Sequence, residues 1–238
     1  MKYETIVPGR FVSRPNRFIA IVAVEGKEAE AHIKNTGRFK ELLVPGATVY
    51  LEDHQTQNMN TGRRTRYSLI SVEKEKRLVN IDSSAANRLV KESLLEGSLI
   101  LPGVSLPLHS LRPESVFKAS RFDFYFVDGK GRTGFLEVKT VTLEEDGIAR
   151  FPDAPTLRGI KHLEELTKAK ESGHLAILLF VIQTGQIRAF EPNDATHRAF
   201  GDALRKAEEA GIIVEAIQCK VDLDEISLTT MVPVALRL

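Results

Sequence analysis

Short stretches in which hydrophobic and polar residues alternate dominate the first part of the chain, up to about residue 78. Alternation with a period of two is typical of strands with one buried face. Gly, Pro and Asn residues that favour turns separate these stretches. The pattern predicts a small β-barrel of the oligonucleotide-binding (OB) type with a helical turn over 38–43, although an SH3-like barrel would give the same pattern. The predicted strands are Glu4–Val7, Arg17–Val24, Glu28–His32, Ala47–Glu52 and Tyr67–Glu73.

The pattern changes after residue 80. A helix is predicted up to Glu96, with Ser83 or Ser84 as its N-cap and Gly97 as its stop. The proline-containing segment 99–116 is predicted to be a loop. Helices alternating with apolar runs predict an α/β or α+β domain over 81–238, built on a mixed sheet and preceded by the barrel domain over 1–80. Further helices are predicted over 156–170 and 195–210, and further strands over 176–182, 186–190, 212–217 and 225–230.

A hairpin is predicted in the middle of this second domain. Its arms are Ser120–Val127 and Gly134–Leu143, joined by a Gly-rich turn. Because side chains alternate along a strand, Glu137 and Lys139 share one face, opposite Leu136 and Val138. The hairpin would bring Asp123 alongside Glu137 and Lys139.

Two carboxylates and a lysine that converge in this way can hold Mg²⁺ (or Mn²⁺) and activate water against a phosphodiester. We therefore take Asp123, Glu137 and Lys139 as candidate catalytic residues, and the two acidic ones as metal ligands. The alternative interpretation is a solvated strand face, on which charged and apolar residues commonly alternate.

The helix that follows carries a basic face. Arg158 and His162 are one turn apart, with Lys161 beside them, and such a face can contact the scissile phosphate or its neighbours. The alternative is an exposed helix surface on which these residues pair with Glu164 and Glu165.

A second basic segment lies in the polar stretch 55–66, which contains Arg63, Arg64 and Arg66. As a loop between barrel strands it can follow a phosphate backbone, or it can simply be a solvated loop. The formal net charge of the chain is only +1, but residues 1–78 contain 14 Lys and Arg against 9 Asp and Glu. This distribution suits phosphate contacts in the barrel and a metal site in the second domain.

Composition excludes several other classes. The 238 residues are 42% hydrophobic and 27% charged, typical of a soluble globular protein. The lone Cys219 excludes a disulfide framework. No signal peptide, membrane span, P-loop, G-x-G-x-x-G or G-x-S-x-G motif is present. We expect a cytoplasmic protein without a membrane partner.

A series of ordered motifs resembles the sugar fermentation stimulation protein family over essentially the whole chain. The resemblance implies an OB-like barrel, a C-terminal domain of the PD-(D/E)xK (restriction-endonuclease-like) superfamily, DNA binding and an association with maltose metabolism. The motifs are Gly9–Phe11, Asn35–Gly37, Ala86–Val90, Ser120–Asp123, Glu137–Lys139, Thr142–Leu143, Ala149–Ala154, Arg158–Gly159, Lys161–Leu163 and Leu178–Val181.

The resemblance also implies residue roles. Asp123, Glu137 and Lys139 correspond to the superfamily's catalytic positions, and Glu92 to an additional metal ligand. Phe122 stands where the superfamily motif has proline. Three hypotheses remain. The first two are a Mg²⁺- or Mn²⁺-dependent nuclease acting on DNA and a non-catalytic, largely sequence-nonspecific DNA-binding regulator of sugar metabolism. A metabolic or protein-interaction role without nucleic acid is a third.

Overall fold

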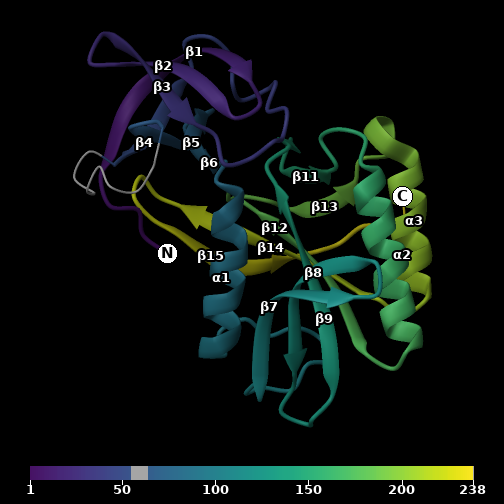
Figure 1. Cartoon of the computed structure of the whole chain (residues 1–238). Coiled ribbons are helices and arrows are strands. Elements are labelled where there is room, and N and C mark those ends of the chain that lie inside the picture. The colour runs from purple at the N-terminus through teal and green to yellow at the C-terminus, as the bar shows by residue number, and fades with distance from the viewer. Residues whose placement is uncertain (55–63, 238) are drawn as a thin grey trace.

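The structure is a computed structural model and describes residues 1–54 and 64–237. The first part of the chain forms a closed β-barrel (Figure 1). Strands β1 to β5 are antiparallel neighbours in the order β3-β2-β1-β4-β5, and a short parallel pairing of β3 with β5 closes the barrel. The predicted OB-type barrel is therefore confirmed. The strands are β1 (Ile6–Asn16), β2 (Ile19–Val24), β3 (Lys27–His32), β4 (Thr48–Asp53) and β5 (Tyr67–Lys74).

Strand β1 is longer than predicted because it passes through Gly9 instead of ending there. A Cβ at Gly9 would lie 3.1 Å from the Ala23 carbonyl oxygen, so glycine permits the close approach of two barrel strands. Register shifts after Phe11 and Ser13 bend β1, which pairs with both β2 and β4. The predicted helical turn is a single turn, in which Leu43 N–H donates to the Phe39 carbonyl (2.8 Å).

The C-terminal domain is built on a mixed sheet with the strand order β15-β14-β12-β9-β8-β7. The central pairs β9–β12 and β12–β14 are parallel, and the outer pairs are antiparallel. Confirming the prediction, β8 and β9 form a hairpin. The strands are β7 (Ser110–Phe117), β8 (Ser120–Val127), β9 (Thr133–Val141), β12 (Leu175–Ile182), β14 (Ile213–Val221) and β15 (Ile226–Val232).

Strand β7 corrects the prediction of a loop over 99–116. It lies at the edge of the sheet, where Pro113 can be accommodated because one side of an edge strand needs no ladder partner. Four short strands, of which only β13 overlaps a predicted one, add a small sheet, β10-β11-β13, and extend the barrel sheet with β6. These are β6 (Arg77–Asn80), β10 (Glu144–Glu145), β11 (Ile148–Phe151) and β13 (Ala189–Pro192), the last replacing the strand predicted over 186–190.

Helices cover both faces of the C-terminal sheet (Figure 1). Helix α1 (Ser83–Glu96) lies on one face, and α2 (Leu157–Glu171) and α3 (Asp194–Glu209) lie on the other. The predicted N-cap of α1, Ser83 or Ser84, is wrong. The N-cap is Asp82, whose carboxylate accepts the Ser84 N–H. Gly97 ends α1 with a φ of 74°, as predicted. No helix in the described residues is long and apolar enough to cross a membrane.

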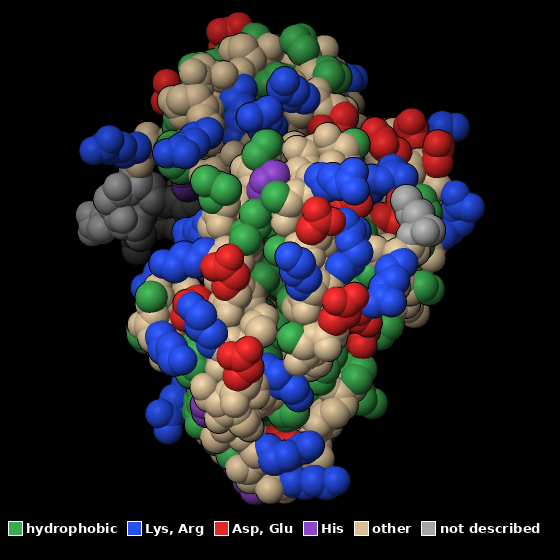
Figure 2. Space-filling view, turned by 90° about the vertical axis from the view of Figure 1, so that its right-hand side faces the viewer, with side chains coloured by type: hydrophobic (Ala, Val, Ile, Leu, Met, Phe, Trp, Pro, Cys, Tyr) green, Lys and Arg blue, Asp and Glu red, His purple; other side chains and the backbone are tan. Residues whose placement is uncertain are grey.

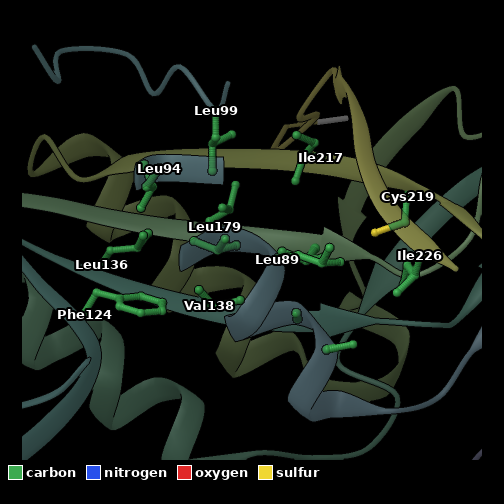
Figure 3. Packing of buried hydrophobic residues seen from close by; sticks show 14 of the residues in the cluster. Leu89, Leu94, Leu99, Phe124, Leu136, Val138, Leu179, Ile217, Cys219 and Ile226 are labelled. Carbon is green, nitrogen blue, oxygen red and sulfur yellow. The ribbon is translucent and has the colours of Figure 1, made fainter. Parts of the chain in front are cut away.

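Apolar contacts fix α1 against the sheet, as Figure 3 shows. Leu89 and Leu94 pack in one buried cluster with Leu136 and Val138 of β9. The opposite face of the sheet packs against α2 and α3 in a second cluster. Because β12 is buried on both faces, its continuous apolar sequence needs no alternation.

A polar network joins the barrel to the C-terminal domain. The Gln183 side-chain amide donates to the Asn80 side-chain oxygen (3.0 Å) and to the Asp82 carbonyl (2.8 Å). Asn80 in turn donates to the Tyr3 hydroxyl (2.9 Å). On the barrel, Lys34 forms an ion pair with Asp82 (2.7 Å). Buried polar groups that satisfy one another restrict how the barrel and the sheet can be arranged.

Asp128, at the turn of the β8–β9 hairpin, gives a stability prediction. Burial opposes its ionisation, but hydrogen bonds from the Arg132 side chain and from backbone N–H groups outweigh burial and lower its pKa to about 2. The stabilisation is therefore complete above the ordinary pKa of 3.8 and is lost as the pH falls toward 2.

We expect Asp128→Asn to lower the free energy of unfolding at pH 7 by about 1 to 3 kcal/mol, because it removes charge-assisted hydrogen bonds. Urea unfolding between pH 7 and pH 2 should show the difference from wild type shrinking below about pH 4. Asp222→Asn, which changes an exposed ion pair with Lys220, is the control and should have little effect. A difference that does not change with pH would contradict this account.

Candidate active site

The site begins where β8 and β9 separate. The ladder between them ends at the pair Phe124 and Leu136. Asp123, which precedes Phe124 in β8, lies just beyond this end of the ladder. In place of a backbone partner, the Asp123 carboxylate accepts the Val138 N–H through Oδ2 (2.8 Å). Its Oδ1 accepts a hydrogen bond from the Asn87 side chain of α1 (2.7 Å). The backbone of β9 and the helix together fix this carboxylate.

The separation of the strands coincides with a change of face along β8. Phe124 and Phe126 pack in the cluster under α1, as their alternation requires. By alternation Phe122 should share the face of Phe124, but it packs in the cluster under α2 and α3. The backbone therefore twists at Asp123, which lies between the two faces.

Glu137 is almost completely buried, at 3% exposure, and faces α2 as the alternation of β9 predicts. Its Oε1 accepts hydrogen bonds from Lys139 Nζ and from His162 Nδ1. Its Oε2 is buried and has no hydrogen-bond partner among the described residues. A buried carboxylate oxygen without a partner is costly, so this atom marks a position suited to a bound cation.

The environment shifts the pKa values of the two carboxyl groups in opposite directions. Burial, together with the nearby charge of Glu137, raises the pKa of Asp123 despite the hydrogen bonds from Val138 and Asn87. Burial also opposes ionisation of Glu137, but the hydrogen bond from His162 and the charge of Lys139 outweigh it and lower the pKa of Glu137. Asp123 accepts the N–H of Val138, the residue after Glu137, so the two carboxyl groups belong to one site.

His162 lies in the site and not on an exposed basic face. It is 6% exposed, and its Nδ1 lies 3.4 Å from Lys139 Nζ. Arg158 Nε donates to His162 Nε2 (3.4 Å). This pattern assigns the ring proton to Nδ1, which donates to Glu137. The side chain predicted to contact nucleic acid instead positions the central carboxylate.

The remainder of the basic face is exposed. Arg158 and Lys161 are both on the surface of α2. No ion pair joins Arg158 or Lys161 to Glu164 or Glu165 in the described structure, and Glu165 pairs with Lys168 instead (2.7 Å). Arg158 and Lys161 therefore stand beside the site as exposed cations.

The other predicted residues make no hydrogen bond or ion pair with the two carboxylates in the described structure. Glu92 pairs with Arg88 one turn earlier on α1 (2.8 Å), and Asn87 is the α1 residue that contacts Asp123. In the barrel, Arg66 forms a bidentate pair with Asp53 (2.8 and 2.6 Å) and its guanidinium stacks on Tyr67. Arg64 is exposed, and Arg63 lies outside the described residues.

The fit of a divalent cation follows from these donors. No group of three or more His, Cys, Asp and Glu residues in the described chain is arranged to hold a metal. Mg²⁺ does not require such a group, because it commonly takes one or two carboxylates and completes its shell with water and substrate phosphate. Asp123 and Glu137, with the unpartnered Oε2, fit this requirement.

Fold and site define an α/β protein with an OB-type barrel followed by a restriction-endonuclease-like mixed-sheet domain. Family models agree: residues 12–81 match the "SfsA N-terminal OB domain" and residues 84–225 match the "Sugar fermentation stimulation protein RE domain". The chain belongs to the sugar fermentation stimulation protein family.

Individual relatives match over their full length. Sugar fermentation stimulation protein homologs from Clostridium beijerinckii and Desulfitobacterium hafniense (strain DSM 10664 / DCB-2) are 48% and 47% identical, each over 99% of this chain and over 100% and 99% of their own. The solved structure of Pyrococcus furiosus SfsA in complex with Ca²⁺ is 27% identical, with a TM-score of 0.87 over 99% of this chain and 98% of that chain.

The contact between Asn87 and Asp123 gives a second prediction. In a double-mutant cycle of Asn87→Ala and Asp123→Ala, measured by urea unfolding in the presence of a chelator, we expect a coupling energy of about 0.5 kcal/mol or more. The matched cycle of Glu92→Ala and Asp123→Ala should be additive within about 0.5 kcal/mol. Coupling to Glu92 with none to Asn87 would show that our assignment of the α1 residue is wrong.

Proposed function

We propose that this protein hydrolyses phosphodiester bonds of DNA with the help of a divalent cation. The observation that carries the proposal is the buried, unpartnered Oε2 of Glu137, which lies in a site shared with Asp123 and Lys139. A purely structural ion pair has no need for a second, repelling carboxylate beside it.

Asp123 and Glu137 would hold Mg²⁺ or Mn²⁺ between them. When bound, such a cation lowers the energy of the negative charge that develops on phosphate oxygens. That a family member was solved in complex with Ca²⁺ supports a divalent cation, because Ca²⁺ and Mg²⁺ both prefer carboxylate oxygens.

The chain's own residues then have separate tasks. The oxygen of a water molecule forms a bond to phosphorus as the bond to the leaving ester oxygen breaks. Lys139 Nζ stands at the site as a charged donor that can orient the water and stabilise the phosphate. His162 holds Glu137 in place, and the exposed Arg158 and Lys161 can contact flanking phosphates.

DNA as the substrate is supported by the barrel and by charge. OB-type barrels commonly bind nucleic acid along a basic surface. In Figure 2 several Lys and Arg side chains lie on the visible face of the barrel, with some Asp and Glu among them, and residues 1–78 as a whole contain 14 Lys and Arg against 9 Asp and Glu. The barrel is therefore the stronger attractor of a phosphate backbone.

A DNA-binding regulator without hydrolytic activity is the second candidate. One observation favours it: Lys139 and His162 already surround Glu137 Oε1, so the site has a stable arrangement without a cation. The cleavage experiment below separates the two candidates.

We expect the wild-type protein to cleave labelled DNA in the presence of Mg²⁺ or Mn²⁺ but not of EDTA. Lys139→Ala should reduce the cleavage rate about 100-fold or more, because it removes a charge at the reacting phosphate. Gel analysis of single- and double-stranded oligonucleotides measures both. Lys220→Ala, which alters an exposed ion pair with Asp222, is the matched control.

Full activity of an Asp123→Ala protein would contradict the proposal. DNA binding without cleavage, equal in wild type and Lys139→Ala, would favour the regulator.

A further prediction concerns affinity. Replacing Arg63, Arg64 and Arg66 together by alanine should weaken DNA binding to a similar degree for all sequences and reduce the salt dependence of the binding constant. Because Asp53 already pairs with Arg66, Arg66→Ala alone should weaken binding less than Arg64→Ala. Fluorescence anisotropy over a range of NaCl concentrations measures both effects. Unchanged affinity of the triple variant would exclude this segment from the DNA interface.

A further inference from the structure

A cavity of about 300 Å³ lies where the barrel meets the C-terminal domain. Its walls come from three places: the barrel segment 35–39, the end of β9 with the residues after it (140–143), and the segment 150–156 between β11 and α2. Each of these segments contains residues of a motif that the catalytic site does not use: Asn35–Gly37, Thr142–Leu143 and Ala149–Ala154.

Several polar groups that line the cavity have no partner among the described residues. Thr142 is 8% exposed, and its hydroxyl makes no hydrogen bond within the described chain. Asn35 uses its side-chain oxygen to accept the Gly37 N–H (2.9 Å), which leaves its amide NH₂ free. The exposed Arg38 guanidinium has no ion pair in the described structure, although its backbone N–H donates to Asp153 (2.8 Å). Thr142 is buried, Asn35 is half-buried and Arg38 is exposed, so these groups are available to a ligand in the cavity that can supply their missing partners.

Flat apolar groups form another part of the wall. Phe151 is half-buried, and its ring packs against Phe180 and Phe200 with centroids 5.5 and 5.2 Å away. Pro152 and Pro155 lie beside it along the cavity. An aromatic ring held in place and a few unpaired amide and hydroxyl groups are the combination by which proteins take up a single nucleobase.

The cavity is next to the catalytic residues in the chain. Thr140, on its wall, directly follows Lys139 in β9. Thr156, also on its wall, is the N-cap of α2, two residues before Arg158. A nucleotide whose base occupied the cavity would therefore lie beside the chain positions of Lys139 and Arg158.

We propose that the cavity binds one unpaired nucleotide next to the scissile phosphate, so that the substrate is single-stranded DNA or a duplex with an unpaired end. In a duplex each base is stacked and paired, and must leave the helix before it can enter such a cavity. The proposal rests on the proposed function, since it takes DNA as the ligand.

Binding of fluorescein-labelled oligonucleotides, measured by anisotropy in EDTA, tests the proposal without any cleavage. We expect a single strand to bind about tenfold or more tightly than the blunt duplex of the same sequence. An abasic residue placed at successive positions should weaken binding about tenfold at one position only, because stacking and hydrogen bonds of one base are lost. Equal affinities for strand and duplex, or no sensitive position, would overturn the proposal.

Substitutions in the cavity test whether it is the site that binds the unpaired nucleotide. Ala154→Phe places a ring in the cavity and should remove the preference for the single strand, whereas Ala210→Phe, at an exposed position after α3, should keep it. Thr142→Val keeps the shape and removes the unpaired hydroxyl, and should weaken single-strand binding several-fold. Unchanged preference in folded Ala154→Phe and Thr142→Val proteins would overturn the proposal.

Cleavage with Mn²⁺ then separates this proposal from the proposed function. A preference for unpaired DNA in binding, with no cleavage of any DNA, would support the cavity assignment and contradict hydrolysis. Equal cleavage rates for single strand and blunt duplex would support hydrolysis and overturn the cavity assignment.

Discussion

A hydrogen bond from the backbone of β9 to the Asp123 carboxylate organises the site. The ladder between β8 and β9 ends at Phe124 and Leu136, and the Val138 N–H, which would otherwise lack a partner, donates to Asp123. An unpaired buried N–H is costly, so the sheet itself holds the carboxylate beside Glu137. Asp123 thus satisfies the N–H that the strand separation leaves without a backbone partner, and the same hydrogen bond places Asp123 in one site with a second acidic residue, Glu137.

Two hydrogen-bond donors stabilise the buried Glu137 carboxylate, and they come from different elements. Lys139 lies on β9 with Glu137, while His162 reaches it from α2. Helix α2 starts at the cavity between the barrel and the sheet, and the polar network of Asn80, Gln183 and Asp82 fixes how these domains meet. The arrangement of the domains thus bears directly on what can reach the catalytic residues.

Local pattern was sufficient to predict the barrel, the β8–β9 hairpin and the shared face of Glu137 and Lys139, because alternation and turn chemistry act over a few residues. It was not sufficient for β7, whose edge position accommodates Pro113, or for the small sheet of β10, β11 and β13, which depends on pairing of distant segments. Local pattern also could not identify Asn87 as the α1 residue that donates to Asp123. Nor could it show that His162 is buried against Glu137 while the basic residues beside it on α2 are exposed. The spacing of Asn87 and Leu94 on α1, which puts both on the sheet side, was the available signal for the first.

Titration of the protein with Mn²⁺ by isothermal calorimetry tests the central claim, that Asp123 and Glu137 form a cation site, most directly. The account predicts that the wild-type chain binds Mn²⁺ and that binding is lost in the Asp123→Asn, Glu137→Gln double variant, while circular dichroism shows both proteins folded. The same stoichiometry and affinity in wild type and double variant would contradict it.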